Sequence, residues 1–365
     1  MTLRPHVLAC RLDSAGDVLL TGPALRALAA GADRVTLLCG PRGREAARLL
    51  PGVDEVRVFL APWIDPQPPA VEESAILGLR DEIAGLNADE AVIFTSAHQS
   101  SLPLALVLRL AGVPRIGAIS DDYPGSLLDV RHRVPPDIHE VERALSLVRQ
   151  LGYELPGDDD DRLRITSSAS RRPRGRHPKI AIHPGASVPA RTWGAARWRA
   201  LVDALVARGH HLVITGSVAE RDLVDAVAGP PRPTVMKLPG ATTLQELAGV
   251  LADAEVLVAG NTGPAHLAAA VGTPVVSIFA PTVPATCWRP WGVPQRLLGN
   301  QHIACAGCRA TVCPVAGHPC ISEIPLEAAV DAVESLGRSR TQPSPREDNR
   351  VGVALVRENG RQECA

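Results

Sequence analysis

The sequence predicts an α/β protein made of two doubly wound, Rossmann-like domains that face one another across a cleft. Short apolar segments alternate with amphipathic ones in both halves of the chain, which is typical of βα units around a parallel sheet. The alternation stops between residues 157 and 178 and then restarts. At 365 residues, the chain also exceeds the length at which a single core usually stops growing.

The first half of the chain contains a regular series of strand and helix patterns. We expect strands at residues 6–12, 34–39, 53–59, 91–95 and 115–119. We expect helices at residues 18–30 (interrupted at Gly22-Pro23), 45–50, 71–86, 102–111 and 140–151. Together they form a predicted N-terminal domain, residues 1–165.

The break in the pattern marks the expected boundary between the domains. Residues 158–161 are four consecutive aspartates, which we interpret as a solvated charged run. Residues 162–166 could add an edge strand. The polar stretch that follows is rich in Arg and Pro, and we expect residues 166–178 to form the linker.

The second half repeats the alternation. Strands are expected at residues 179–183, 211–215 and 235–237 and twice within 255–280, and helices at 195–208, 220–228, 244–252 and 326–336. They form a predicted C-terminal domain, residues 179–336, with a cysteine-rich loop at 302–320. Residues 337–365 are polar, and we expect a disordered tail.

Composition excludes some partners. The net charge is −1 and no basic stripe with interleaved aromatic residues is present, so nucleic acid is not an expected partner. No apolar run is long enough to span a membrane, and residues 1–10 are too short and too interrupted for a signal peptide. We therefore expect a cytoplasmic protein that could contact the inner face of the membrane.

The segment 255–280 carries the most informative motif. It predicts a buried strand, the polar turn Asn261-Thr262-Gly263, a short helix with Pro264 in its first turn, and a second buried strand. Asn261 or Thr262 can cap the helix, and Gly263 allows a ligand to approach the backbone. Free N–H groups and the helix dipole then predict a phosphate site. A lone histidine is usually a packed helix residue, but His266 follows the turn so closely that we favour ligand contact.

Two further strand ends in this half carry polar residues. Ser187 and Arg191 follow the first strand, and an arginine can hold a phosphate with a two-pronged contact. The alternative is a surface arginine stacked on Trp193 or Trp198. Glu220 follows the second strand, where an acid commonly accepts hydrogen bonds from ribose. Its alternative is an acid at a helix N-terminus without a ligand.

The loop after the first strand contains two carboxylates. Asp17 is either a general base at the cleft or an acid that complements the helix dipole, and position alone does not decide between them. Asp13 is the competing carboxylate. Other polar residues at strand ends in this half could contact a ligand: Ser14, Ser96, His98, Gln99 and residues 131–133.

Four cysteines cluster near the end of the second half: Cys305, Cys308, Cys313 and Cys320. Clustered thiols in a cytosolic protein are more typical of metal ligands than of disulfides, so we expect structural zinc or an iron–sulfur cluster here. Free thiols, or a disulfide formed on oxidation, are equally consistent with the spacing.

Three groups of residues, in this order along the chain, together resemble glycosyltransferase family 9, which contains the ADP-heptose:lipopolysaccharide heptosyltransferases. They are the segment from Gly16 to Leu25, His183-Pro184-Gly185 with Arg191 and Trp193, and the segment from Asn261 to Ala270 with Pro274. The resemblance runs from about Val7 to Leu336. It implies the GT-B fold, an ADP-sugar donor held mainly by the C-terminal domain, and an acceptor held by the N-terminal domain, where Ser14, His98 and Gln99 are candidate contacts. Similar cysteine-rich loops occur in some family members, so we expect a structural or acceptor-side role for the four cysteines, not a catalytic one.

The resemblance also implies roles for individual residues. Asp17 matches the family's proposed catalytic base, and Glu220 resembles the acid on the nucleoside side. Arg191 falls where heptosyltransferases typically carry a lysine that binds donor phosphate, and Asn261 replaces their usual aspartate. The residues that match the contacts to the diphosphate and the sugar are Thr262, Gly263 and His266.

The expected reaction is an inverting, metal-independent transfer of a sugar from an ADP-sugar to a hydroxyl of a cell-envelope glycan or glycolipid. A heptose is the expected sugar, Asp17 the expected base, and no cofactor is expected for catalysis. A nucleotide-sugar epimerase of the same fold and a non-catalytic sugar-nucleotide-binding protein are the alternatives. A product formed without an acceptor would indicate the epimerase.

Overall fold

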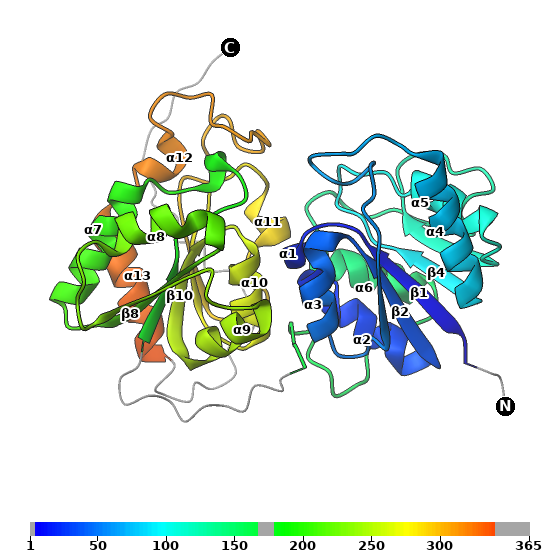
Figure 1. The fold of residues 1–365 in the computed structure, drawn as a ribbon, viewed down its shortest axis with the longest axis horizontal. Helices are drawn as coiled ribbons and strands as arrows, with labels where there is room; N and C mark the ends of the chain where they lie inside the picture. The colour runs from blue at the N-terminus through cyan, green and yellow to red at the C-terminus, as the bar shows by residue number, and fades with distance from the viewer. Residues whose placement is uncertain (1–3, 167–178, 340–365) are drawn as a thin grey trace, which may run out of the picture.

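The computed structural model describes residues 4–166 and 179–339, which form two parallel six-stranded sheets flanked by helices (Figure 1). The predicted fold class, two doubly wound α/β domains, is confirmed. The predicted linker beyond Thr166 and the predicted tail beyond Ser339 lie outside the described residues. None of the described helices is both long and apolar enough to cross a membrane.

The first sheet is formed by strands from residues 6–132. Its strand order is β3 (Glu55–Val58), β2 (Arg34–Cys39), β1 (His6–Arg11), β4 (Glu90–Ile93), β5 (Arg115–Ile119) and β6 (Val130–His132). Its helices are α1 (Ala15–Leu20), α2 (Gly22–Gly31), α3 (Arg44–Leu49), α4 (Glu73–Leu86), α5 (Leu102–Leu110) and α6 (Glu140–Gln150), with a 3₁₀ turn η1 (Pro41–Gly43). The break between α1 and α2 falls at Thr21, because Pro23 has no N–H to continue the first helix.

The second sheet repeats this plan with strands from residues 179–298. Its strand order is β12 (Gln295–Leu298), β11 (Val275–Ile278), β10 (Ala254–Gly260), β7 (Lys179–His183), β8 (His211–Gly216) and β9 (Val235–Pro239). Its helices are α7 (Ala195–Ala207), α8 (Arg221–Ala228), α9 (Leu244–Asp253), α10 (Gly263–Ala270), α11 (Ala285–Trp288), α12 (Pro319–Ser322) and α13 (Leu326–Ser339), with 3₁₀ turns η2 (Pro189–Arg191) and η3 (Val218–Glu220).

The expected elements are present, with differences at short ones. Strands β6 and β12 and helices α11 and α12 were not predicted, because none is longer than four residues and such short segments show no clear periodicity. The edge strand expected at 162–166 is wrong. That segment is extended but unpaired with any strand, and Thr166 instead donates its backbone N–H to Leu49 O at 2.6 Å.

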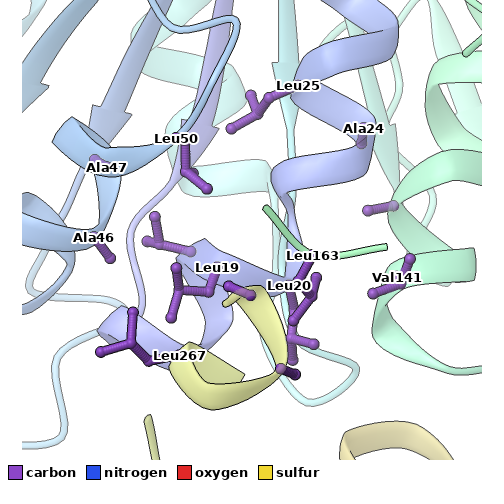
Figure 2. Packing of buried hydrophobic residues seen from close by; sticks show 14 of the residues in the cluster. Leu19, Leu20, Ala24, Leu25, Ala46, Ala47, Leu50, Val141, Leu163 and Leu267 are labelled. Atoms are coloured by element: carbon purple, nitrogen blue, oxygen red, sulfur yellow. The ribbon is translucent and has the colours of Figure 1, made fainter. Parts of the chain in front are cut away.

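The two domains meet where α1 packs against α10 (Figure 1). A β-carbon at Gly16 would lie 3.1 Å from His266 Cδ2 and 3.4 Å from Gly263 Cα, so glycine is needed for this approach. Leu19 and Leu267 belong to one apolar cluster that continues from one domain into the other (Figure 2). Each leucine buried this way contributes roughly 1.5–3 kcal/mol of hydrophobic free energy.

A second contact between the domains involves the acidic run. Asp159 is only 7% exposed and accepts two hydrogen bonds from Arg26, at 2.7 and 2.8 Å. Asp161 Oδ1 accepts a hydrogen bond from Trp291 Nε1 at 3.2 Å, and the Trp291 ring lies 4.4 Å from the ring of His139. The interpretation of this run as simply solvated is therefore wrong for Asp159 and Asp161. Asp159 is bound within the first domain, and Asp161 contacts Trp291 of the second domain.

Candidate active site

A cleft of about 670 Å³ lies between the two domains, at the carboxyl ends of strands from both sheets. This is where ligands bind in doubly wound folds. Most of the site residues predicted from the sequence line it: Ser14, Asp17, His98, Gln99, Ser187, Arg191, Glu220, Asn261, Thr262, Gly263, Pro264 and His266. Residues from sequence-distant loops are thus brought together as one site.

Asp17 lies in the first turn of α1 and faces this cleft. Its Oδ2 accepts a hydrogen bond from Ser14 Oγ at 2.7 Å, and its Oδ1 lies 3.3 Å from Arg11 Nη2. Burial raises the pKa of Asp17, but the Arg11 cation, the Ser14 hydrogen bonds and His266 together lower that pKa below its ordinary value. The side chain is still 22% exposed. Asp17 is therefore an ionised carboxylate that a ligand can reach.

Arg11, at the end of β1, holds the acidic groups around Asp17 in place. The guanidinium is 3% exposed and lies 2.9 Å from Asp13 and 3.4 Å from Glu140, at its Nε and Nη2 respectively. Burial alone lowers the pKa of Arg11, and the surrounding carboxylates raise it above its ordinary value. Sequence reasoning missed Arg11, although an arginine at the end of an otherwise apolar strand was a signal for it.

Asp13 is held more tightly than Asp17. Gln99 Nε2 donates a hydrogen bond to Asp13 Oδ1, while Gln99 Oε1 accepts from Ser96 N at 3.0 Å. Burial raises the pKa of Asp13 despite the nearby Arg11 cation, and its side chain is 8% exposed. Both ends of the Gln99 amide are thus used inside the protein. Asp17 is the more accessible of the two carboxylates.

The opposite wall of the cleft is the N-terminus of α10. Of the two residues expected to cap the helix, Asn261 and Thr262, Thr262 occupies the N-cap position in an extended conformation, but its side chain makes no capping hydrogen bond. Gly263 is the first residue of the helix, and its N–H has no intrahelical acceptor. Pro264 has no N–H to satisfy. An anion in the cleft can accept from Gly263 and benefit from the helix dipole.

His266 lies in the same turn of α10. Its side chain is 4% exposed, and its Nδ1 has no hydrogen-bond partner among the described residues. Burial lowers the pKa of His266 to about 4, even though the nearby Asp17 acts to raise it. The imidazole is therefore neutral at pH 7, with a buried polar atom that a ligand in the cleft can satisfy.

Arg191 extends from η2 into the cleft. Its Nε donates to Thr282 Oγ1 at 3.2 Å, which fixes the guanidinium from behind. Burial lowers its pKa, while Asp17 raises it. Trp193 and Trp198 pack edge to face on each other, with ring centroids 5.2 Å apart and both side chains buried. The guanidinium extends into the cleft, which does not support the stacked surface arginine.

Glu220 both caps a helix and lines the cleft. Its Oε2 accepts the backbone N–H of Ser217 at 2.7 Å in a capping box. A β-carbon at Gly185 would lie 1.8 Å from Glu220 Oε1, so the loop after β7 can lie against the carboxylate only because residue 185 is glycine. His183 Nε2 lies 3.9 Å from Glu220 Oε2 on the other side.

Only some of the residues predicted to contact an acceptor line the cleft. His98 is exposed in the loop after β4 and lines the cleft. Residues 131–133 do not line it, and Arg131 instead donates from Nε to Ser120 O at 3.0 Å within its own domain. Residues that line the cleft and were missed by sequence reasoning include Arg42, Trp288 and Arg309.

The four clustered cysteines lie between β12 and α13, outside the cleft. Burial and the neighbouring thiols raise the pKa of Cys320 to about 11. Within residues 4–166 and 179–339, no three His, Cys, Asp or Glu side chains are grouped so that they could hold a metal ion. The residues as arranged do not fit a metal, so metal binding here stays a prediction and no step below relies on it.

The chain is similar to known proteins along most of its length. Residues 86–318 match the sequence profile of glycosyltransferase family 9 (heptosyltransferase). Lipopolysaccharide heptosyltransferase 3 of Escherichia coli is 37% identical over 115 residues, which are 31% of this chain and 34% of that protein. The matches to the first curated relatives span a third to a half of those proteins.

Solved structures show the same fold over nearly the whole chain. A glycosyl transferase family 9 structure from Veillonella parvula has a TM-score of 0.74 at 18% identity and covers 93% of this chain and 99% of its own. The ADP-heptose lps heptosyltransferase II of E. coli has a TM-score of 0.71 at 17% identity, covering 92% and 100%. Because the family profile matches more than half of the chain, this protein belongs to glycosyltransferase family 9, the heptosyltransferases.

Proposed function

We propose that this protein is an inverting glycosyltransferase that moves a heptose from ADP-heptose to a hydroxyl of a lipopolysaccharide-type acceptor. The observation that carries the proposal is the position of Asp17, an ionised carboxylate facing the anion-binding turn of α10 across the cleft. The names of the relatives, which are lipopolysaccharide and lipooligosaccharide heptosyltransferases, support the sugar and the acceptor class.

In the proposed reaction Asp17 acts as general base. Its carboxylate takes the proton of the acceptor hydroxyl while the hydroxyl oxygen attacks the anomeric carbon of the sugar. The bond from that carbon to the diphosphate oxygen breaks, and ADP leaves with the electron pair. Attack opposite the leaving group inverts the anomeric configuration. The proton then passes from Asp17 to water.

The leaving diphosphate gains negative charge, which the C-terminal wall of the cleft can stabilise. Arg191 and the Gly263 N–H are fixed before the reaction, so they need no rearrangement as charge develops. A preorganised donor of this kind contributes about 2.7–4 kcal/mol to transition-state stabilisation. His266 Nδ1 would contact the sugar or the phosphate, and Glu220 would accept hydrogen bonds from the ribose.

We further propose that the reaction needs no divalent metal. The charge of the diphosphate is met by a guanidinium and the positive end of a helix, which serve the role that Mg²⁺ serves in other phosphate sites. Transfer should therefore continue unchanged in the presence of EDTA. A loss of activity that Mg²⁺ or Mn²⁺ restores would contradict this part of the proposal.

The whole reaction can be tested with purified protein, ADP-heptose and a heptose-deficient lipopolysaccharide core. We expect ADP release that depends on the acceptor, and a product heavier by one heptose residue in mass spectrometry. A rearranged sugar nucleotide formed without acceptor would indicate an epimerase instead. Binding of ADP-heptose without any product would indicate a non-catalytic protein.

The nucleotide is tested separately, because Asn261 stands where related enzymes carry an aspartate. Thermal unfolding with ADP, UDP and GDP compares the three nucleotides on the same protein. We expect ADP to raise the unfolding temperature most, since a ligand that binds only the folded state stabilises it. A larger shift with UDP or GDP would rule out ADP-heptose as the donor.

A further inference from the structure

Arg309 belongs to the cysteine-rich loop, yet it lines the same cleft as Asp17. In the described parts of the chain, its guanidinium has neither an ion-pair nor a hydrogen-bond partner, and it is exposed to the cleft. The cleft arginine Arg42, by contrast, lies 3.9 Å from the carboxylate of Asp65. An arginine held in a cleft without a carboxylate is available to bind an anion.

The backbone holds Arg309 in a defined place. Its N–H donates to Thr282 O at 2.9 Å, and Gly307 N–H donates to Pro281 O at 2.7 Å. On the other side, Ala190 N–H donates to Thr311 O at 2.9 Å, next to Arg191. Thr282 therefore fixes both arginines, Arg191 through its hydroxyl and Arg309 through its carbonyl. The tip of this loop is built as part of the cleft wall.

The backbone conformation of Arg309 also indicates a ligand-binding role. Its φ is +52°, in the left-handed region that residues other than glycine adopt rarely. Such conformations persist only where surrounding contacts impose them, and they cluster at sites that bind ligands. Here the contacts to Thr282 and Ala190 on either side impose it.

His98 of the N-terminal domain and Arg309 of the C-terminal domain line the same cleft, and both side chains are exposed. Burial lowers the pKa of His98, and the positive charge of Arg309 lowers it further, against the opposing effect of Asp13 and Asp17. Arg309 keeps its positive charge at every pH in the physiological range. A negative group in this part of the cleft can therefore bind Arg309 and accept a hydrogen bond from His98.

We propose that Arg309 and His98 form an anion subsite that bridges the two domains and binds a phosphate or carboxylate group of a substrate. The subsite is distinct from the diphosphate position at Arg191 and α10, although Thr282 supports both. Because this position is separate, an acidic group on the acceptor is the favoured source of the anion, and occupation by the donor diphosphate is an alternative outcome of the test. The assignment to substrates rests on the proposed transferase function, whereas the binding of an anion does not.

Direct binding tests the subsite without any sugar transfer. Inorganic phosphate is titrated calorimetrically into the full-length protein saturated with ADP, so that the site at Arg191 is already filled. We expect Arg309→Asn to weaken phosphate binding about tenfold, the size of a lost charge-assisted hydrogen bond. Asn is chosen because it tolerates the left-handed conformation. Arg309→Lys keeps the charge and should retain most of the affinity.

The matched control is Arg296→Asn. Arg296 is an exposed arginine of β12 outside the cleft, so this substitution removes the same charge from the same domain. Its phosphate affinity should equal that of the unaltered protein. Unfolding temperatures of all variants show that each one folds. Phosphate binding by the ADP-saturated protein that depends on Arg309 supports the subsite even if no heptose is transferred.

Steady-state kinetics then identify the source of the anion. If the acceptor supplies it, Arg309→Asn raises the acceptor KM about tenfold and leaves kcat and the ADP affinity within twofold. If the donor supplies it, the ADP affinity falls instead and the acceptor KM stays unchanged. The proposal would be overturned if Arg309→Asn and Arg296→Asn had equal phosphate affinities, equal ADP affinities and equal acceptor KM values.

Discussion

Arg11 Nη2 lies 3.3 Å from Asp17 Oδ1, and this contact connects the buried end of β1 to the carboxylate that faces the cleft. The same guanidinium contacts Asp13 and Glu140, so one buried cation serves three acids. Asp17 is the most exposed of the three, with the other two 8% and 4% exposed. Asp17 is therefore the acid of the three that we propose as the general base.

Replacing Asp17 with Asn should remove transfer while sparing donor binding. The amide cannot accept the hydroxyl proton, and loss of a general base typically costs 10²–10⁴-fold in rate, so we expect kcat to fall by about that factor. In the proposed mechanism ADP binds the opposite wall, so its Kd should stay within about twofold. The matched control is Asp331→Asn, which alters an exposed residue of α13. Normal transfer by Asp17→Asn would show that another group is the base.

Replacing Ser14 with Ala should shift the acidic limb of the pH profile upward. The Ser14 hydroxyl stabilises the charged form of Asp17, so its removal raises the pKa of Asp17. Asp17 can act as base only when it is deprotonated. With a raised pKa it becomes protonated, and activity is lost, at a higher pH than in the unaltered protein. The measurement is kcat/KM against pH, with the exposed Ser126→Ala as control. An acidic limb that stays in place, or moves to lower pH, would contradict the role of Ser14.

Replacing Arg11 with Met should destabilise the protein strongly. Removing one partner of a buried ion cluster leaves uncompensated charge and typically costs about 3–5 kcal/mol. This corresponds to a drop in unfolding temperature on the order of 10 °C. The matched control, Arg221→Met, removes an exposed arginine of α8 and should change little.

The loss of stability in Arg11→Met should also depend on pH. Burial raises the pKa of Asp13 and Glu140, and without Arg11 both pKa values rise further. A raised carboxyl pKa in the folded state favours folding at low pH and disfavours it as the pH rises through that value. The difference in unfolding temperature from the unaltered protein should therefore be larger at pH 7 than at pH 5. An equal difference at both values would show that the carboxylates are not the cause.

The donor side of the site followed from local sequence patterns. In a parallel sheet the carboxyl ends of neighbouring strands meet at one edge, so polar residues after successive strands are placed together without knowledge of the tertiary contacts. This is why Arg191, Glu220 and His266 could be predicted as lining one cleft. The exact hydrogen bonds could not, as the missing cap at Thr262 shows.

The groups that support or complete the site depend on contacts between distant segments. Arg11 and Glu140 are far apart in sequence, and Arg309 reaches the cleft only because its loop is hydrogen-bonded to Thr282. The acidic run showed the same limit, because Asp159 is buried by Arg26 from α2. Charge patterns alone describe such residues as solvated, and only the fold reveals their partners.

Replacing Gly185 with Ala should weaken nucleotide binding. The new methyl group would occupy the position of the Glu220 carboxylate, which must then leave both its cap on Ser217 and its place at the cleft. Loss of hydrogen bonds from ribose to a charged acceptor should raise the Kd for ADP about tenfold. Gly249→Ala on α9 has open space around it and should leave the Kd unchanged. If the two variants bound ADP equally well, Glu220 would not be part of the nucleotide site.

Replacing Arg191 with Gln should weaken ADP binding, and replacing it with Lys should restore part of the affinity. The guanidinium can make two charge-assisted hydrogen bonds to a phosphate, whereas an ammonium acts as a single point charge. We expect a rise in Kd of about 10- to 100-fold for Gln and a smaller rise for Lys. Calorimetry with ADP and with adenosine separates the two halves of the ligand. Adenosine lacks the diphosphate, so its affinity should be the same in all three proteins. If Arg191→Gln weakened adenosine and ADP equally, Arg191 would be acting on the shape of the site and not on the phosphate.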